Sequence, residues 1–313
     1  MNRKINLGLV TLGLATAVIV IGIVLVFLFL NPIAQKTNSE KIIITTSFYP
    51  LYFFTQQIAG DKADITNITP AGAEPHDYEP TAQDIAKIES SQILVLVGPD
   101  LEPWGNNIKQ NIDQQKTLVV ITGDQLMTQI VAEGGENIVD PHIWLRPPLA
   151  KVIADKITAG LIQVDPINKD YYQANNNELK LKLDNLDNMY KQGLLNCMKK
   201  DIITSHAAFG YMATSYGLNQ VPISGLSPNE EPSPKQLADI ANFAESHDVK
   251  YIFFEALVNQ KLSQTIATEV GAQTLVLNPL EGLTKDEVSQ GQDYFTVMKS
   301  NLDNLKIALE CST

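Results

Sequence analysis

Apolar and polar residues alternate along the chain in two distinct ways from Lys41 onward. Short runs rich in β-branched residues, such as "KIIITTS", "QILVLVG" and "TLVVIT", predict buried strands, because branched side chains pack well on a pleated sheet. Between them, stretches such as "LYFFTQQIAG" space their apolar residues at helical intervals, and Thr81 followed by Asp84 predicts a capped helix start. Strands that alternate with helices predict an α/β fold with mainly parallel sheets covered on both faces.

A long helical stripe interrupts this alternation. Its apolar residues recur at spacings of three and four: Leu179, Leu183, Leu186, Tyr190 and Leu194. They predict one helix over residues 166–196, a rod of about 45 Å at 1.5 Å per residue. Such a rod can brace two lobes against each other. A coiled-coil dimer is the competing interpretation, which the short stripe and the scarcity of flanking charge pairs disfavour.

The alternation of strands and helices restarts after this stripe. Strands are predicted at "DIITS", "VKYIFFE" and "TLVLNPLEG", and helices at "SPKQLADIANFAESHD", "NQKLSQTIATEVG" and "YFTVMKSNLDNLKIALEC". We therefore predict two Rossmann-like lobes joined by one long helix. The expected organisation is a membrane anchor and tether (1–40), an N-terminal α/β lobe (41–165), the linking long helix (166–196) and a C-terminal α/β lobe (197–313).

The N-terminal segment predicts a transmembrane helix. Arg3 and Lys4 precede an uncharged, mostly apolar run from Leu7 to Leu30, which is long enough to cross the roughly 30 Å hydrocarbon layer. The positive charges place the N-terminus in the cytoplasm and the rest of the chain outside, anchored by residues 7–30 at the extracytoplasmic face of the bacterial membrane. A cleaved signal peptide is the alternative, although the run is longer than a usual signal core and no cysteine follows it.

Charge and cysteine content narrow the range of partners. A net charge of −12 and a pI near 4.8 disfavour nucleic acid and anionic membrane surfaces as partners and leave cations as candidates. The simpler explanation of the acidic charge is that it keeps the protein soluble. The two cysteines, Cys197 and Cys311, both lie in the part expected outside the cell. A disulfide between them is the economical interpretation, with two separate thiols as the alternative.

Three of the four histidines follow strands or turns of the predicted sheets. They are His76 in "EPHDYEP", His142 in "VDPHIWL" and His206 in "ITSHAAFGY". Ligands of open α/β sheets gather outside the carboxyl ends of strands, so a common location is expected. His247 ends a helix in "AESHDVK", where it is expected to interact with the helix dipole.

Three clustered imidazoles predict a bound cation, because partly protonated rings would otherwise repel one another. Zinc accepts histidine nitrogens and commonly takes four ligands, so a carboxylate is expected as the fourth. Glu255 in "IFFEAL" and Glu281 in "LNPLEGL" both follow apolar runs. Glu255 has the competing role of a helix N-terminal carboxylate, since "ALVNQKL" is predicted to open a helix, which favours Glu281.

Several blocks of the chain resemble one known family. They are "TTSFYPLYFFTQQIAGD", "PHDYEPTAQDIAKI", "GPDLEPW", "DPHIWL", "SHAAFGYMATSYGL", "EPSPKQLADI" and "LNPLEGLT". In this order they resemble the zinc/manganese ABC-transporter solute-binding family, and the likeness extends from about Lys41 to the C-terminus. The resemblance implies a metal-binding receptor, not an enzyme, that delivers its ion to an ABC permease and its ATPase subunit.

The resemblance also implies the metal ligands. It places them at His76, His142, His206 and Glu281, although many relatives have an aspartate where Asn278 stands. Manganese-type members carry glutamate in place of the third histidine, so His206 favours Zn²⁺ over Mn²⁺. Copper and nickel would also bind such a set of ligands strongly, so the identity of the bound metal depends on which metals are available outside the cell.

Two departures from the family pattern concern the neighbourhood of the site. Arg146 stands where an aspartate is usual, which affects the start of the following helix. The segment "GDQLMTQIVAEGGENIVD" contains no histidine, so the metal-collecting loop of many zinc-type members is absent.

Two other functions compete with metal capture. A zinc hydrolase also uses three histidines, but it keeps an open fourth position that Glu281 would close, and the chain has no HExxH motif. A surface adhesin could use the same fold, with the membrane anchor displaying it.

Overall fold

The computed structural model describes residues 41–133 and 136–312, and residues 41–313 form one compact unit. The first half contains a sheet of four parallel strands in the order β2-β1-β3-β4. Its strands are β1 (Ile42–Thr46), β2 (Ala63–Asn67), β3 (Ile93–Leu96) and β4 (Leu118–Ile121). The helices that connect them are α2 (Tyr49–Ala59), α3 (Ala82–Ser90) and α4 (Trp104–Asn111).

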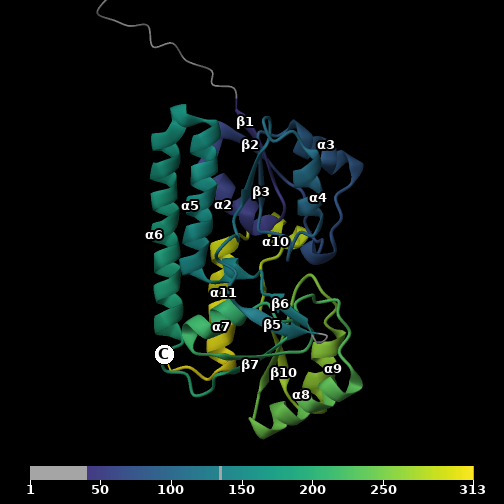
Figure 1. Cartoon of the computed structure of the whole chain (residues 1–313). Coiled ribbons are helices and arrows are strands. Elements are labelled where there is room, and N and C mark those ends of the chain that lie inside the picture. The colour runs from purple at the N-terminus through teal and green to yellow at the C-terminus, as the bar shows by residue number, and fades with distance from the viewer. Residues whose placement is uncertain (1–40, 134–135, 313) are drawn as a thin grey trace, which may run out of the picture. The chain divides into compact units, whose positions relative to one another are not determined.

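The second half, the lower part of Figure 1, repeats this plan with a parallel sheet. Its strand order is β10-β9-β7-β8. Its strands are β7 (Asp201–Thr204), β8 (Asn219–Pro222), β9 (Tyr251–Phe254) and β10 (Gln273–Val276). Its helices are α7 (Gly210–Tyr216), α8 (Pro234–Ser246), α9 (Lys261–Glu269), α10 (Lys285–Ser289) and α11 (Tyr294–Ala308). The predicted α/β class with parallel sheets is confirmed.

The long helix α6 (Lys169–Gly193) runs beside α5 (Pro147–Val164), as Figure 1 shows. The short turn Pro166–Asn168 precedes it, so the helix is a few residues shorter at each end than predicted. Every residue of the predicted stripe is buried: Leu179, Leu183, Leu186, Tyr190 and Leu194. The stripe packs within this chain, against α5, α2 and α11, which removes the argument for a coiled-coil dimer.

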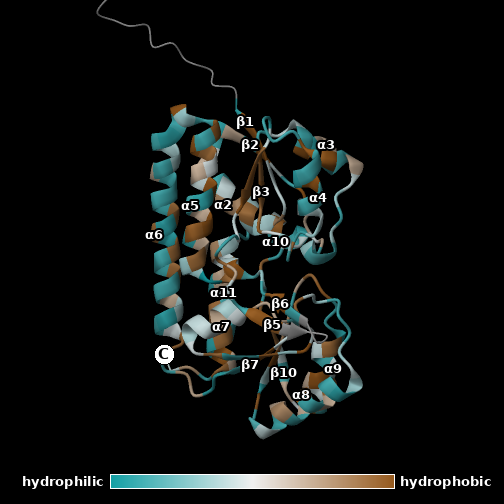
Figure 2. Ribbon diagram, in the orientation of Figure 1, coloured by the Kyte–Doolittle hydropathy of each residue, from teal (hydrophilic) through white to brown (hydrophobic). Residues whose placement is uncertain are grey.

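One apolar cluster extends through both halves of the compact unit. Tyr294 of α11 packs against Phe54 of α2 with ring centroids 4.9 Å apart, and its hydroxyl donates to the Trp144 carbonyl at 2.6 Å. The Trp144 indole in turn donates to the Pro279 carbonyl at 2.7 Å. In Figure 2 the inner strands of the first sheet are coloured hydrophobic, in keeping with this burial. A continuous core between the halves restricts their relative motion.

Several local predictions are confirmed. Cys197 and Cys311 form a disulfide across a sequence separation of 114 residues. Thr81 and Asp84 form a reciprocal capping box at the start of α3. His247 ends α8, where its Nδ1 lies 2.9 Å from the Phe243 carbonyl oxygen.

Two local expectations need correction. The segment after β4 forms an antiparallel pair, β5 (Ile130–Glu133) and β6 (Glu136–Val139), which was not predicted. The Gly–Gly pair between the two strands in the sequence is a typical hairpin signal. The helix expected to open directly after Glu255 begins only at Lys261, so Glu255 has no helix terminus to stabilise.

The predicted membrane-spanning segment, Leu7–Leu30, lies outside the described residues. Among the residues that are described, no helix is both long enough and apolar enough to cross a bilayer.

Candidate metal centre

His76 lies in a short 3₁₀ turn, Pro75–Asp77, in the loop beyond β2. Proline sets the backbone angle at the start of the turn, and the Glu74 carboxylate accepts from the His76 backbone N–H at 3.2 Å. The loop then passes directly into the capping box of α3, with the Tyr78 hydroxyl donating to Asp84 at 2.7 Å. The imidazole of His76 is thus carried on a loop fixed at both ends.

His142 follows the strand β6 and is fully buried. Asp140 holds it by two contacts: one carboxylate oxygen accepts from the His142 backbone N–H at 2.9 Å and lies 2.8 Å from its Nδ1. Because a carboxylate can only accept, Nδ1 carries the hydrogen. The lone pair of the neutral ring is therefore on Nε2.

His206 follows β7 and is held in the same way by an acid from the neighbouring strand. Its Nδ1 lies 2.8 Å from Oε1 of Glu255, which directly follows β9 and is 2% exposed. Two parallel strands side by side thus bring the ligand and its partner to one edge of the sheet. Glu255 again leaves the Nε2 lone pair available.

Glu281 lies in the buried loop that follows β10. Leu280 before it adopts a positive φ of 58°, which is strained for a branched residue. The Asn278 side chain supports this turn by accepting from the Leu280 backbone N–H at 2.7 Å, and Asn278 is itself held by Asn301 of α11. Asn278 therefore shapes the loop that presents the Glu281 carboxylate.

The structure brings His76, His142, His206 and Glu281 together, with one ligand atom from each lying within 4.8 Å of all the others. The Nε2 atom of His142 lies 3.3 Å from that of His76 and 3.4 Å from that of His206. Oε1 of Glu281 lies 2.9, 3.1 and 3.5 Å from Nε2 of His142, His206 and His76.

These separations match the edges of a zinc tetrahedron. Four ligand atoms at about 2.0–2.1 Å from a tetrahedral ion lie roughly 3.3 Å from one another. The first half supplies two of the four side chains, His76 and His142, and the second half supplies His206 and Glu281. A single ion could therefore be held between ligands from the two halves.

The charges around the cluster also fit a cation. Burial alone would raise the pKa of Glu281, but the charge of His206 and hydrogen bonds from His142 and His206 hold it well below its ordinary value. Burial would lower the pKa of His206, yet Glu255 and Glu281 raise it well above its ordinary value. In the absence of an ion, the protonated ring of His206 therefore balances the ionised carboxylate of Glu281, and a divalent cation would displace that proton.

Buried carboxylate oxygens around the cluster lack a hydrogen-bond partner. These are one oxygen each of Glu74, Asp140, Glu255 and Glu281. Unpaired buried oxygens are costly, and a nearby positive ion would offset that cost.

Sequence reasoning found the four clustered side chains but not their supporting acids. It weighed Glu255 as a ligand, whereas the structure places it behind His206, outside the group of four. Asp140 and Glu74 were missed. Both precede a cluster histidine by two residues, and an acid at that spacing can bond back to the histidine backbone.

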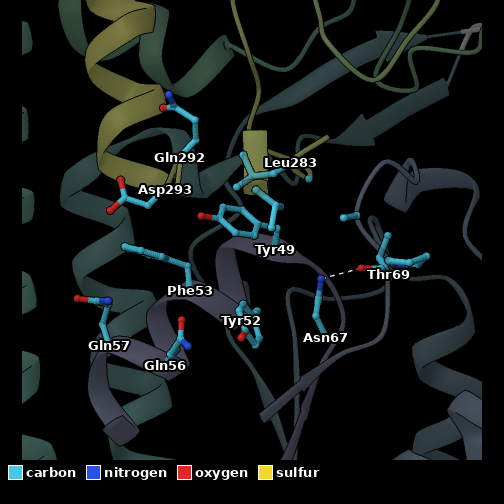
Figure 3. Close-up of a pocket in the computed structure, with 14 residues that line it drawn as sticks. Tyr49, Tyr52, Phe53, Gln56, Gln57, Asn67, Thr69, Leu283, Gln292 and Asp293 are labelled. Carbon is cyan, nitrogen blue, oxygen red and sulfur yellow. Dashed lines mark hydrogen bonds between the residues drawn. The ribbon is translucent and has the colours of Figure 1, made fainter. Parts of the chain in front are cut away.

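A cavity of about 510 Å³ lies between α2 and the loop that follows Glu281 (Figure 3). Tyr49, Tyr52, Phe53, Leu283 and Asp293 are among the residues that line it. None of the four clustered side chains lines this cavity. The cluster of four side chains is therefore separate from this cavity.

Comparison with known proteins places the chain in a family. The family described as "Zinc-uptake complex component A periplasmic" matches residues 44–308. The chain belongs to this zinc-uptake family. The resemblance inferred from the sequence motifs is thereby confirmed.

Relatives of this zinc-uptake member include both sequences and solved structures. The high-affinity zinc uptake system protein ZnuA of Bacillus subtilis is 42% identical over 88% of this chain and 90% of its own length. The crystal structure of Zn(II)-bound AdcA from Streptococcus pneumoniae is 38% identical, with a TM-score of 0.75 over 86% of this chain and 58% of that one. The present chain thus matches only part of that longer protein.

A third relative combines two described activities. The laminin binding protein Lmb of Streptococcus agalactiae, described as bifunctional with adhesin and metal transporting activity, is 34% identical, with a TM-score of 0.78 over 86% of this chain and all of that one. The family to which the chain belongs is defined by zinc uptake, which is a binding role and not an enzymatic one.

Proposed function

We propose that this protein is an extracytoplasmic receptor that binds Zn²⁺ through His76, His142, His206 and Glu281 and delivers it to an ABC importer. The observation that carries the proposal is the convergence of three Nε2 atoms and one carboxylate oxygen at tetrahedral separations. Three imidazoles and one carboxylate suit zinc better than manganese, which prefers oxygen-rich sites. Zinc is the cargo of the protein, and its binding would displace protons from the cluster.

The proposed capture mechanism follows from the position of the ligands in the chain. We assign residues 41–165 and 197–313 to two Rossmann-like lobes and residues 166–196 to the helix that braces them. Each lobe supplies two ligands, so one ion links the lobes. The core shared by Phe54, Trp144 and Tyr294 opposes a wide hinge opening. Release would then depend on movement of ligand loops and slight rocking of the lobes.

The proposed location is the outer face of the cytoplasmic membrane, with residues 7–30 as the anchor. The description of the family as periplasmic supports a position outside the cytoplasm. The proposed partners are the permease and the ATPase subunit of an ABC importer, in keeping with a role in zinc uptake.

Adhesion is a second candidate function, because the Streptococcus agalactiae relative is described as having both activities. The hydrolase interpretation is disfavoured, since the Glu281 oxygen fills the fourth position that a catalytic zinc would keep open. Measurement of laminin binding with and without zinc would separate adhesion from metal capture.

Zinc-limited growth tests the proposal. A strain that lacks this protein should regain growth when it expresses the wild type and fail to do so when it expresses Glu281→Ala at the same level. Exposed Glu245 on α8 provides the control, and Glu245→Ala should restore growth fully. Equal growth with Glu281→Ala would refute zinc delivery through this site.

A further inference from the structure

The four clustered side chains differ in their access to solvent. The His142 and His206 side chains are 0% exposed and Glu281 is 1% exposed, whereas His76 is 8% exposed. His76 is therefore the most exposed of the four ligands, and we expect an ion to reach or leave the cluster past the loop that carries it. Whatever fixes that loop should control the rate of exchange.

The loop that carries His76 is tied to the second half by two hydrogen bonds. At its base, the Gly72 backbone N–H donates to the Leu283 carbonyl at 2.9 Å. At its tip, next to His76, the Asn229 side-chain amide donates to the Asp77 carboxylate. The first bond links backbone segments close to Glu281, whereas the second joins two exposed side chains at the solvent edge of the cluster.

The partner segment of Asp77 lies at the surface. Residues 228–232, which include Asn229 and two prolines, line a cavity of about 540 Å³ together with Lys261 and Leu262 of α9. Asp77 and Asn229 are both exposed, so the hydrogen bond between them can be removed by mutation without disturbing the apolar core.

We propose that Asp77 and Asn229 are positioning residues that hold His76 over the cation and limit the rate of its release. The proposal rests on the proposed zinc binding by the cluster. Breaking the bond leaves all four ligands present, but it frees the tip of the loop to move into solvent with His76. An Asp–Asn hydrogen bond at the surface contributes modestly, so its loss should accelerate release about three- to tenfold.

The test measures zinc release from the full chain by mixing the loaded protein with excess EDTA. Asp77→Ala and Asn229→Ala should each release zinc about three- to tenfold faster, and the double variant no faster than either, because both remove the same bond. The exchanged pair Asp77→Asn with Asn229→Asp re-forms the bond in reverse and should restore slow release.

The chain offers a matched control in Asn219 and Asp201. Their side chains form the same kind of exposed amide–carboxylate bond, at 2.7 Å, within the second half. Asn219→Ala should leave the release rate unchanged. Wild-type release rates in Asp77→Ala and Asn229→Ala, or equal acceleration in Asn219→Ala, would overturn the proposal.

A second readout separates this proposal from the proposed function. In metal-free protein, Asn229→Ala should increase amide hydrogen exchange in residues 76–79 of the loop that carries His76 and leave α8 unchanged. If the wild type took up no zinc, the proposed function would fail, while the exchange measurement would still decide whether the bond restrains this loop. Unchanged exchange in residues 76–79 would refute the restraint itself.

Discussion

Replacement of Glu255 by glutamine tests whether this acid supports His206 or binds the ion itself. Glu255 is buried, and its Oε1 lies 2.8 Å from Nδ1 of His206. Glutamine keeps the size of the side chain and one oxygen acceptor, so the ring can keep its orientation. The lost negative charge makes the other ring nitrogen, Nε2, a weaker ligand.

The expected cost follows from this indirect role. Loss of a supporting partner of a ligating histidine usually weakens metal binding about 10- to 100-fold. This range corresponds to about 1.4–2.8 kcal/mol of binding free energy. Loss of a direct ligand in Glu281→Ala should cost more, because it removes a bond to the ion and leaves three ligands.

Competition with a fluorescent zinc chelator gives the affinities, and X-ray absorption gives the coordination shell. Glu255→Gln should bind zinc with reduced affinity and an unchanged shell of three nitrogens and one oxygen. Exposed Glu245 supplies the control, and Glu245→Gln should match the wild type. Two results would refute the reasoning: an unchanged affinity, or a loss as large as that of Glu281→Ala with one oxygen missing from the shell.

Three further predictions concern stability and the support of His142. Cys197→Ser removes a disulfide across a sequence separation of 114 residues, and urea denaturation should show a free energy of unfolding about 4–5 kcal/mol lower. An equal decrease in the free energy of unfolding on reduction of the wild type would confirm that the missing disulfide is the cause. Burial would raise the pKa of Asp84, but hydrogen bonds from Thr81 and other neighbours hold this pKa well below its ordinary value. The ionised carboxylate therefore stabilises the folded protein above about pH 4, and this contribution is lost as the pH falls. Asp84→Ala should therefore lower the free energy of unfolding by about 1 kcal/mol near neutral pH and by less near pH 3, and equal differences at both pH values would contradict the assignment. Gly210→Ala would bring a Cβ within 2.9 Å of the Asp140 carboxylate, which holds His142. Displacement of this carboxylate should weaken zinc binding about tenfold. An unchanged zinc affinity would mean that the carboxylate has room to shift.

Much of the fold could be predicted because its signals are local. The β-branched runs at β1 and β3 are buried strands in the structure, and the stripe from Leu179 to Leu194 forms one buried helix face. The hairpin β5–β6 was missed because its strands are short and only a Gly–Gly pair marks the reversal.

The candidate site could be predicted only in part, for a physical reason. Histidines after strands are visible in a sequence, since the ends of parallel strands meet at one edge of a sheet. The pairing of Glu255 with His206 depends on β7 lying beside β9, and that neighbour relation arises only from tertiary packing. The role of Asn278 in supporting Leu280 depends in the same way on α11, which supplies Asn301.

The central claim is that four side chains hold one zinc ion between the two halves. A crystal structure of the zinc-loaded protein, with anomalous data collected at the zinc edge, tests it directly. We expect a single strong peak about 2.0–2.1 Å from Nε2 of His76, His142 and His206 and from Oε1 of Glu281. A peak at other side chains, or no peak in protein saturated with zinc, would contradict it.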